Sequence, residues 1–171
     1  MKRVVVFGTV HQFQSDGHFL NDAFGRRLSY LIEHLSATLI MEEWSEKCPT
    51  SFAKKYAAKR QIAYRNVGTS SEKEEFQTFV FAQINHPGHD GILPTDEEGP
   101  PLVEYGPLDK QENRERKMIQ NIQSEMESQD IGLFIVGLAH LHSVSAKLKA
   151  AGFDVAAFIW NEIATTTSNA M

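Results

Sequence analysis

The chain has 171 residues, of which 42% are hydrophobic and 23% charged, as is usual for a globular protein. Its formal net charge of −5 argues against a broad phosphate-binding face, so we expect no nucleic-acid partner. No segment reaches the about 18 apolar residues of a membrane span, and the N-terminal apolar run is too short for a secretory signal. We therefore expect one cytoplasmic domain over residues 1–171 that does not enter membranes.

The first part of the chain predicts a strand, a helix and a second strand. The β-branched run at residues 4–7 is typical of a strand buried on both faces of a parallel sheet, and Gly8 should end it. Apolar positions at helical spacing predict an amphipathic helix over 17–35, and residues 38–41 predict the next strand. A right-handed crossover would make the two strands parallel.

The middle of the chain gives weaker signals. Residues 50–64 predict a helix, although 62–67 could instead form a short strand. Acidic residues suit the start of another helix over 70–82. Repeated Pro and Gly residues predict a long irregular loop over 85–106, and long loops in compact domains are usually functional. We expect residues 165–171 to be a disordered tail.

The last part of the chain repeats the plan of the first. Residues 110–129 predict a helix that packs one narrow apolar stripe on the sheet. Residues 133–136 predict a buried strand, 141–150 a helix ended by Gly152, and 153–159 a last strand. The expected fold is therefore α/β and three-layered, a mostly parallel sheet with helices on both faces, built from two pseudo-repeated β–α–β halves.

Each half carries the pattern Gly-x-x-His at the end of its first strand. Gly8 is followed by His11, and Gly137 by His140. A glycine at a strand-to-helix turn permits backbone conformations and close approaches that other residues do not. Because parallel strands end at the same edge of a sheet, both imidazoles should lie where open α/β folds bind ligands. The pair is a candidate for half of an active site, and a packing role for each histidine is the alternative.

Two carboxylates, Glu42 and Glu43, follow the second predicted strand. If that strand neighbours the first, one of them lies beside His11, and only one should face the site because side chains alternate along a strand. Two histidines and a carboxylate could coordinate a divalent metal. They could also act without metal, as general bases toward water.

Arg114 and Arg116 precede the apolar positions of their helix. A guanidinium aimed into the site could hold a substrate carboxylate or phosphate, or stabilise an oxyanion. On these residues alone, a solvated charged face is the alternative.

The ordered set of motifs resembles the TraB/PrgY–TIKI–GumN superfamily, which is related to ChaN and the erythromycin esterases. The resemblance covers residues 4–155. It implies that four side chains converge as catalytic residues and that two glycines shape the turns around them. The catalytic residues would be His11, Glu42, Arg114 and His140, and the glycines Gly8 and Gly137.

The resemblance leaves the register of some site residues open by one or two positions. Glu43 and Arg116 could face the site in place of their neighbours and bind substrate. His142 follows the second motif and is either a further site residue or a plain helix-start residue.

The resemblance implies a hydrolase of peptide or ester bonds in a small-molecule or peptide substrate. In the expected mechanism, Glu42 and His11 activate water, while Arg114 and His140 stabilise the oxyanion. A divalent ion (Mn²⁺, Co²⁺ or Zn²⁺) held by His11, Glu42 and His140 could take part. The alternatives are a non-catalytic protein that sequesters a peptide or haem, and a phosphate-ester enzyme, which no phosphate-cradling Gly-rich motif supports. An edge strand or the long loop could support a homodimer.

Overall fold

The computed structural model describes residues 1–44, 50–68 and 108–160. Within these ranges, the side chains of residues 11, 12 and 108–111 are not described. The predicted helix over 70–82, the loop over 85–106 and the tail over 165–171 lie outside the described residues.

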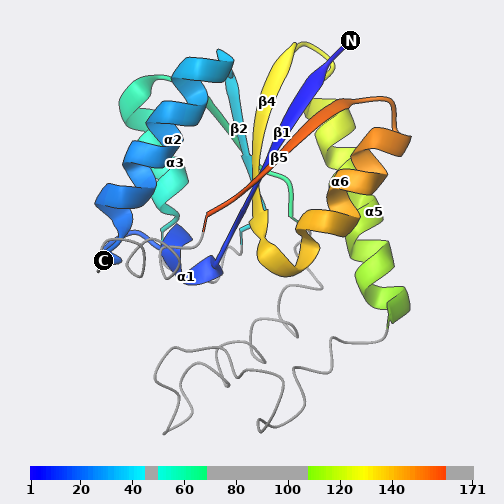
Figure 1. The fold of residues 1–171 in the computed structure, drawn as a ribbon, viewed down its shortest axis with the longest axis horizontal. Helices are drawn as coiled ribbons and strands as arrows, with labels where there is room; N and C mark the ends of the chain where they lie inside the picture. The colour runs from blue at the N-terminus through cyan, green and yellow to red at the C-terminus, as the bar shows by residue number, and fades with distance from the viewer. Residues whose placement is uncertain (45–49, 69–107, 161–171) are drawn as a thin grey trace, which may run out of the picture.

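Within the described residues, five parallel strands form one sheet in the order β3-β2-β4-β1-β5 (Figure 1). The strands are β1 (Arg3–Thr9), β2 (Leu39–Glu42), β3 (Ala63–Asn66), β4 (Ile131–Gly137) and β5 (Asp154–Ile159). The helices are α1 (His11–Gln14), α2 (Asn21–Leu35), α3 (Phe52–Arg60), α5 (Leu108–Glu125) and α6 (Leu141–Ala150), with a 3₁₀ turn, η1 (Leu138–His140), before α6. The predicted three-layer α/β fold with a parallel sheet is confirmed.

Helices cover both faces of the sheet, with α2 and α3 on one side and α5 and α6 on the other (Figure 1). Alternation along β1 shows why both faces need cover. Val5 and Phe7 pack into the core under α2 and α3, whereas Val4 and Val6 pack into the core under α5 and α6. None of the described helices combines the length and the apolar character that crossing a bilayer requires.

After β4 the chain leaves the sheet toward the opposite face from the one it takes after β1 and β2. It leaves β1 and β2 toward the face covered by α2 and α3, whereas it leaves β4, which lies between them, toward the face covered by α6. The condition that the second strand neighbours the first is therefore not met, because β4 separates them. In open α/β sheets, ligands bind at the carboxyl edge where neighbouring strands lead to opposite faces. The ends of β1, β4 and β2 form such an edge.

Among the boundaries that differ from their predictions, two lie in the first part of the chain. Gly8 does not end the first strand, because Gly8 and Thr9 continue the pairing with Val136 and Gly137 of β4. The helix predicted from residue 17 begins only at Asn21, after a turn. Gly17 lies in that turn with a φ of 85°, and a residue with a side chain would be strained in this conformation.

The middle segment forms both the helix and the short strand that its sequence allows, one after the other. Helix α3 begins after Ser51, whose hydroxyl accepts a hydrogen bond from the Lys54 N–H at 3.0 Å as an N-cap. It stops at Gln61, which adopts a left-handed φ of 58°, and β3 follows as an edge strand. The helix predicted over 141–150 is confirmed as α6, and Gly152 follows it with a φ of 90°.

Candidate functional site

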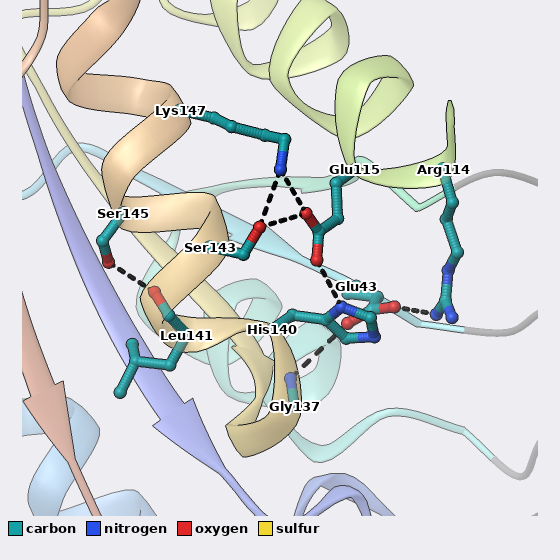
Figure 2. Close-up of polar contacts among 9 residues, drawn as sticks. All are labelled: Glu43, Arg114, Glu115, Gly137, His140, Leu141, Ser143, Ser145 and Lys147. Carbon is teal, nitrogen blue, oxygen red and sulfur yellow. Dashed lines mark hydrogen bonds and ion pairs between the residues drawn. The ribbon is translucent and has the colours of Figure 1, made fainter. Parts of the chain in front are cut away.

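Glu42 and Glu43 extend to opposite faces of the sheet at the end of β2, as the alternation of side chains predicts. Glu43 lies on the face covered by α5 and α6, where its Oε1 pairs with the Arg114 guanidinium (Figure 2). Its Oε2 accepts a long hydrogen bond of 3.5 Å from the Gly137 N–H at the end of β4. Glu43, and not Glu42, is therefore the carboxylate beside Arg114.

Glu42 is fully buried on the other face, toward α3. Its Oε2 accepts hydrogen bonds from the Ser51 hydroxyl at 2.5 Å and from the Tyr64 hydroxyl at 2.7 Å. Burial, reinforced by the charge of Glu42 and its hydrogen bond, raises the pKa of Tyr64 far above its ordinary value, so this phenol stays a neutral donor. Through these hydrogen bonds, Glu42 links the start of α3 and the edge strand β3 to the end of β2.

Arg114 and Glu43 form a buried ion pair, with side chains that are 8% and 2% exposed. Burial lowers the pKa of Arg114 to about 10, and the neighbouring charge of Glu115 acts in the opposite direction. At neutral pH the guanidinium is still charged, so the pair is ionic. Arg116, the alternative in the sequence, is exposed and pairs with Glu112 at 3.1 Å. Of the two arginines, Arg114 is the one at the carboxyl edge.

Glu115, the next residue of α5, holds His140 (Figure 2). The distance between His140 Nδ1 and Glu115 Oε1 is 2.9 Å, and the two side chains are 2% and 6% exposed. The other carboxylate oxygen accepts hydrogen bonds from Ser143 and, at 2.7 Å, from the Lys147 ammonium, both on α6. Glu115 therefore lies at the centre of a buried polar network between α5 and α6.

This network keeps the Glu115 carboxyl group ionised. Burial alone would raise the pKa of Glu115, but the hydrogen bonds from His140, Lys147 and Ser143 together outweigh it and lower the pKa to about 2. An ionised carboxylate can only accept hydrogen bonds, so Nδ1 of His140 carries the proton that it donates. Nε2 is then the ring nitrogen that can take a proton.

The position of Arg114 and Glu115 follows from the period of α5. Each lies one helical turn before a buried apolar residue, Met118 or Ile119, so the charged pair continues the buried stripe of the helix. The sequence prediction used Arg114 and missed Glu115, because the surrounding charged residues are typical of a solvated face. The continuation of the stripe was the signal that could have found it.

The two Gly-x-x-His motifs meet at the carboxyl edge. β1 and β4 are neighbours, and Thr9 pairs with Gly137 where the two strands end. His11 begins α1 one residue after β1 ends, and His140 is the last residue of the turn η1, which follows β4 directly. The side chain of His11 lies outside the described residues, so its distance from His140 stays a prediction.

Two further residues predicted for the site, Gly8 and His142, lie outside the Glu115 network. A Cβ at Gly8 would lie 2.9 Å from a methyl carbon of Leu141, so the glycine allows α6 to pack closely on β1. His142 is exposed on α6. Neither residue contacts the Glu115 network through a described interaction.

Among the described side chains, no group of three His, Cys, Asp or Glu residues could hold a metal ion. Two of the predicted ligands, Glu42 and His140, extend from opposite faces of the sheet and already bond to Ser51 and Glu115, respectively. A histidine that donates from Nδ1 to a carboxylate is typical both of metal ligands and of general bases. His140 would suit either role through Nε2.

No protein-family model, no curated protein and no solved structure matches the chain. The fold and the site define it as a parallel α/β protein with two buried pairs of polar side chains at the carboxyl edge of its sheet. One pair joins a carboxylate to a histidine, and the other joins a carboxylate to an arginine.

Proposed function

We propose that the chain is a hydrolase of ester or peptide bonds in which His140 is the general base. The contact of 2.9 Å between Glu115 and Nδ1 of His140 carries this proposal. A buried carboxylate in this place orients the imidazole and stabilises the imidazolium that forms when Nε2 takes a proton. The location at the carboxyl edge, where the chain leaves β4 and its neighbours in opposite directions, supports a ligand site here.

In the proposed reaction, Nε2 of His140 accepts a proton from a water molecule while the water oxygen attacks the substrate carbonyl carbon. The carbonyl becomes an oxyanion, and the positive charge of the Arg114 guanidinium stabilises it. His140 then returns the proton to the leaving alcohol or amine as the carbonyl reforms. Glu115 keeps its negative charge throughout, because Lys147 and Ser143 hold it ionised.

The proposal includes the resemblance to TraB-like hydrolases, with one site residue shifted by one position. Glu43 replaces Glu42 as the carboxylate next to Arg114, and His11 supplies a second imidazole from the end of β1. If a divalent ion such as Mn²⁺, Co²⁺ or Zn²⁺ takes part, Nε2 of His140 and the imidazole of His11 would be its protein ligands.

A substrate panel tests the proposal. Fluorogenic peptides and p-nitrophenyl esters are assayed with the wild-type chain, His140→Gln, and the control His34→Gln, which changes an exposed histidine on α2. We expect His140→Gln to lower kcat/KM by about 100-fold or more, the usual contribution of a general base. His34→Gln should match the wild type. Turnover by His140→Gln within about threefold of the wild type would contradict the proposed base.

The same panel separates the metal-dependent from the metal-free reaction. Activity lost to a chelator and restored by Mn²⁺, Co²⁺ or Zn²⁺ would assign a metal, whereas activity that resists the chelator would assign His140 acting on water alone. If no substrate is turned over while a peptide or haem binds saturably, the chain is a binding protein and the hydrolase proposal is wrong.

A further inference from the structure

Both cations in the described part of the site already have a carboxylate partner. Arg114 pairs with Glu43, and Lys147 contacts Glu115 at 2.7 Å (Figure 2). Glu42, the last residue of β2, adds a third carboxyl group on the opposite face of the sheet. The described charges at this edge of the sheet therefore cancel or leave a negative excess.

Arg114 is the residue that an anionic substrate would need. A guanidinium binds a phosphate or carboxylate group through two parallel hydrogen bonds, which is why arginine is common in anion sites. Here the Glu43 carboxylate occupies Nη2 of that guanidinium, and both side chains are buried. An incoming anion would have to displace Glu43 or lie beside its negative charge, where burial strengthens the repulsion.

Backbone geometry keeps Glu43 in this place. The Glu43 N–H donates to the Ile135 carbonyl at 3.0 Å, which continues the pairing of β2 with β4 beyond the end of the strand. The Gly137 N–H approaches the second oxygen of the carboxylate. The carboxylate is thus held on Arg114 by two neighbouring strands, and it is not a mobile surface partner.

We propose that Glu43 is a specificity-determining residue, which pairs with Arg114, disfavours a bound substrate that carries a full negative charge there, and so restricts the site to substrates whose reacting group is uncharged before the reaction. Carboxylic esters and amides satisfy this condition, and phosphate esters do not. The inference deepens the proposed hydrolase function and rests on it for the kind of bond that is cleaved. The exclusion of anions from Arg114 stands on the ion pair alone.

The test measures anion binding and needs no substrate. Inorganic phosphate is titrated into the full wild-type chain, Glu43→Gln, Glu43→Asp and Glu112→Gln at constant ionic strength, with calorimetry and thermal unfolding as readouts. Glu43→Gln removes the negative charge and keeps the shape of the side chain. Glu43→Asp keeps the charge. Glu112→Gln removes the same charge from the exposed pair with Arg116, on the same helix as Arg114.

We expect Glu43→Gln to bind phosphate at least about tenfold more tightly than the wild type, because a buried guanidinium loses its competing anion. Glu43→Asp and Glu112→Gln should both stay close to the wild type. If Glu43→Gln folds only when phosphate is present, that rescue also supports the proposal. Equal phosphate affinity of Glu43→Gln and Glu112→Gln would overturn it, as would wild-type binding as tight as that of Glu43→Gln.

Failure of this inference can be told apart from failure of the proposed function. If Glu43→Gln gains phosphate binding and no ester or peptide is hydrolysed by the wild type, the exclusion of anions holds and the hydrolase proposal is wrong. If esters are hydrolysed and the phosphate affinity does not change, the hydrolase proposal holds and the role of Glu43 is wrong.

Discussion

Adjacent residues at the carboxyl edge have different partners. Glu42 and Glu43 separate because a strand alternates its side chains, and Arg114 and Glu115 separate because a helix turns by about 100° per residue. One position therefore decides whether a carboxylate bonds to hydroxyl groups or to a guanidinium. The sequence predicted Glu42, Glu43 and Arg114 as site residues and missed Glu115, and the choice between Glu42 and Glu43 depended on which elements lie opposite.

Asn21 shows how a single side chain supports the turn after β1. It is buried, and its amide donates hydrogen bonds to the carbonyls of Phe13 at 3.2 Å and Ser15 at 3.0 Å. These bonds fix the path between α1, where His11 lies, and α2. Ser15 in turn bridges to Ser51, next to Glu42.

We expect Asn21→Ala to lower the free energy of unfolding by about 1–3 kcal/mol, because two carbonyls lose their donor in a buried place. If His11 acts in catalysis, turnover should fall as well. Urea unfolding measures the stability change. The control Asn113→Ala, at an exposed position on α5, should change stability by less than about 0.5 kcal/mol. Equal effects of the two substitutions would contradict the supporting role of Asn21.

At the scale of elements, local sequence predicted most of what formed. The unbroken apolar runs predicted β1, β2 and β4 because these strands are buried on both faces. The apolar stripe predicted α5 because Met118, Ile119 and Ile122 are all buried at helical spacing. The exact end of β1 was wrong, because Gly8 stays in the sheet through pairing with a strand more than a hundred residues away. Such pairing leaves no local pattern.

The start of α3 couples a helix cap to the buried carboxyl of Glu42. Ser51 accepts from the Lys54 N–H and donates to Glu42, so one hydroxyl serves both. We expect Ser51→Ala to cost about 2–3 kcal/mol, because the cap and a hydrogen bond to a buried carboxyl group are lost together. Thermal or urea unfolding measures this loss. Ser124→Ala, at an exposed serine of α5, is the matched control and should be nearly neutral. A loss below about 0.5 kcal/mol for Ser51→Ala would refute the coupling.

At the scale of the whole molecule, the strand order decides which predicted residues meet. The sequence predicted parallel strands and a shared carboxyl edge, and it placed either Glu42 or Glu43 beside His11 on the condition that β1 and β2 are neighbours. The crossover from β1 to β2 instead leaves room for β4 between them. Gly137 at the end of β4 therefore approaches the carboxylate of Glu43, and His140 in the turn after β4 contacts Glu115 of α5. No spacing within the chain specifies that order, because it depends on how the two halves dock.

The docking of α6 against α5 through Glu115 should make the stability of the molecule depend on pH in acid. The folded chain holds the pKa of Glu115 at about 2, below the about 4.3 of an unfolded chain. Stability from this group is thus complete above pH 4.3 and is lost as the pH falls toward 2, with a total of at most about 3 kcal/mol. Glu115→Gln should be less stable than the wild type at pH 7, and urea unfolding at pH 7, 5, 4 and 3 should show the two curves converging. Glu112→Gln, which changes an exposed carboxylate, should instead run parallel to the wild type. A constant gap between Glu115→Gln and the wild type across this range would show that the Glu115 network does not control acid stability.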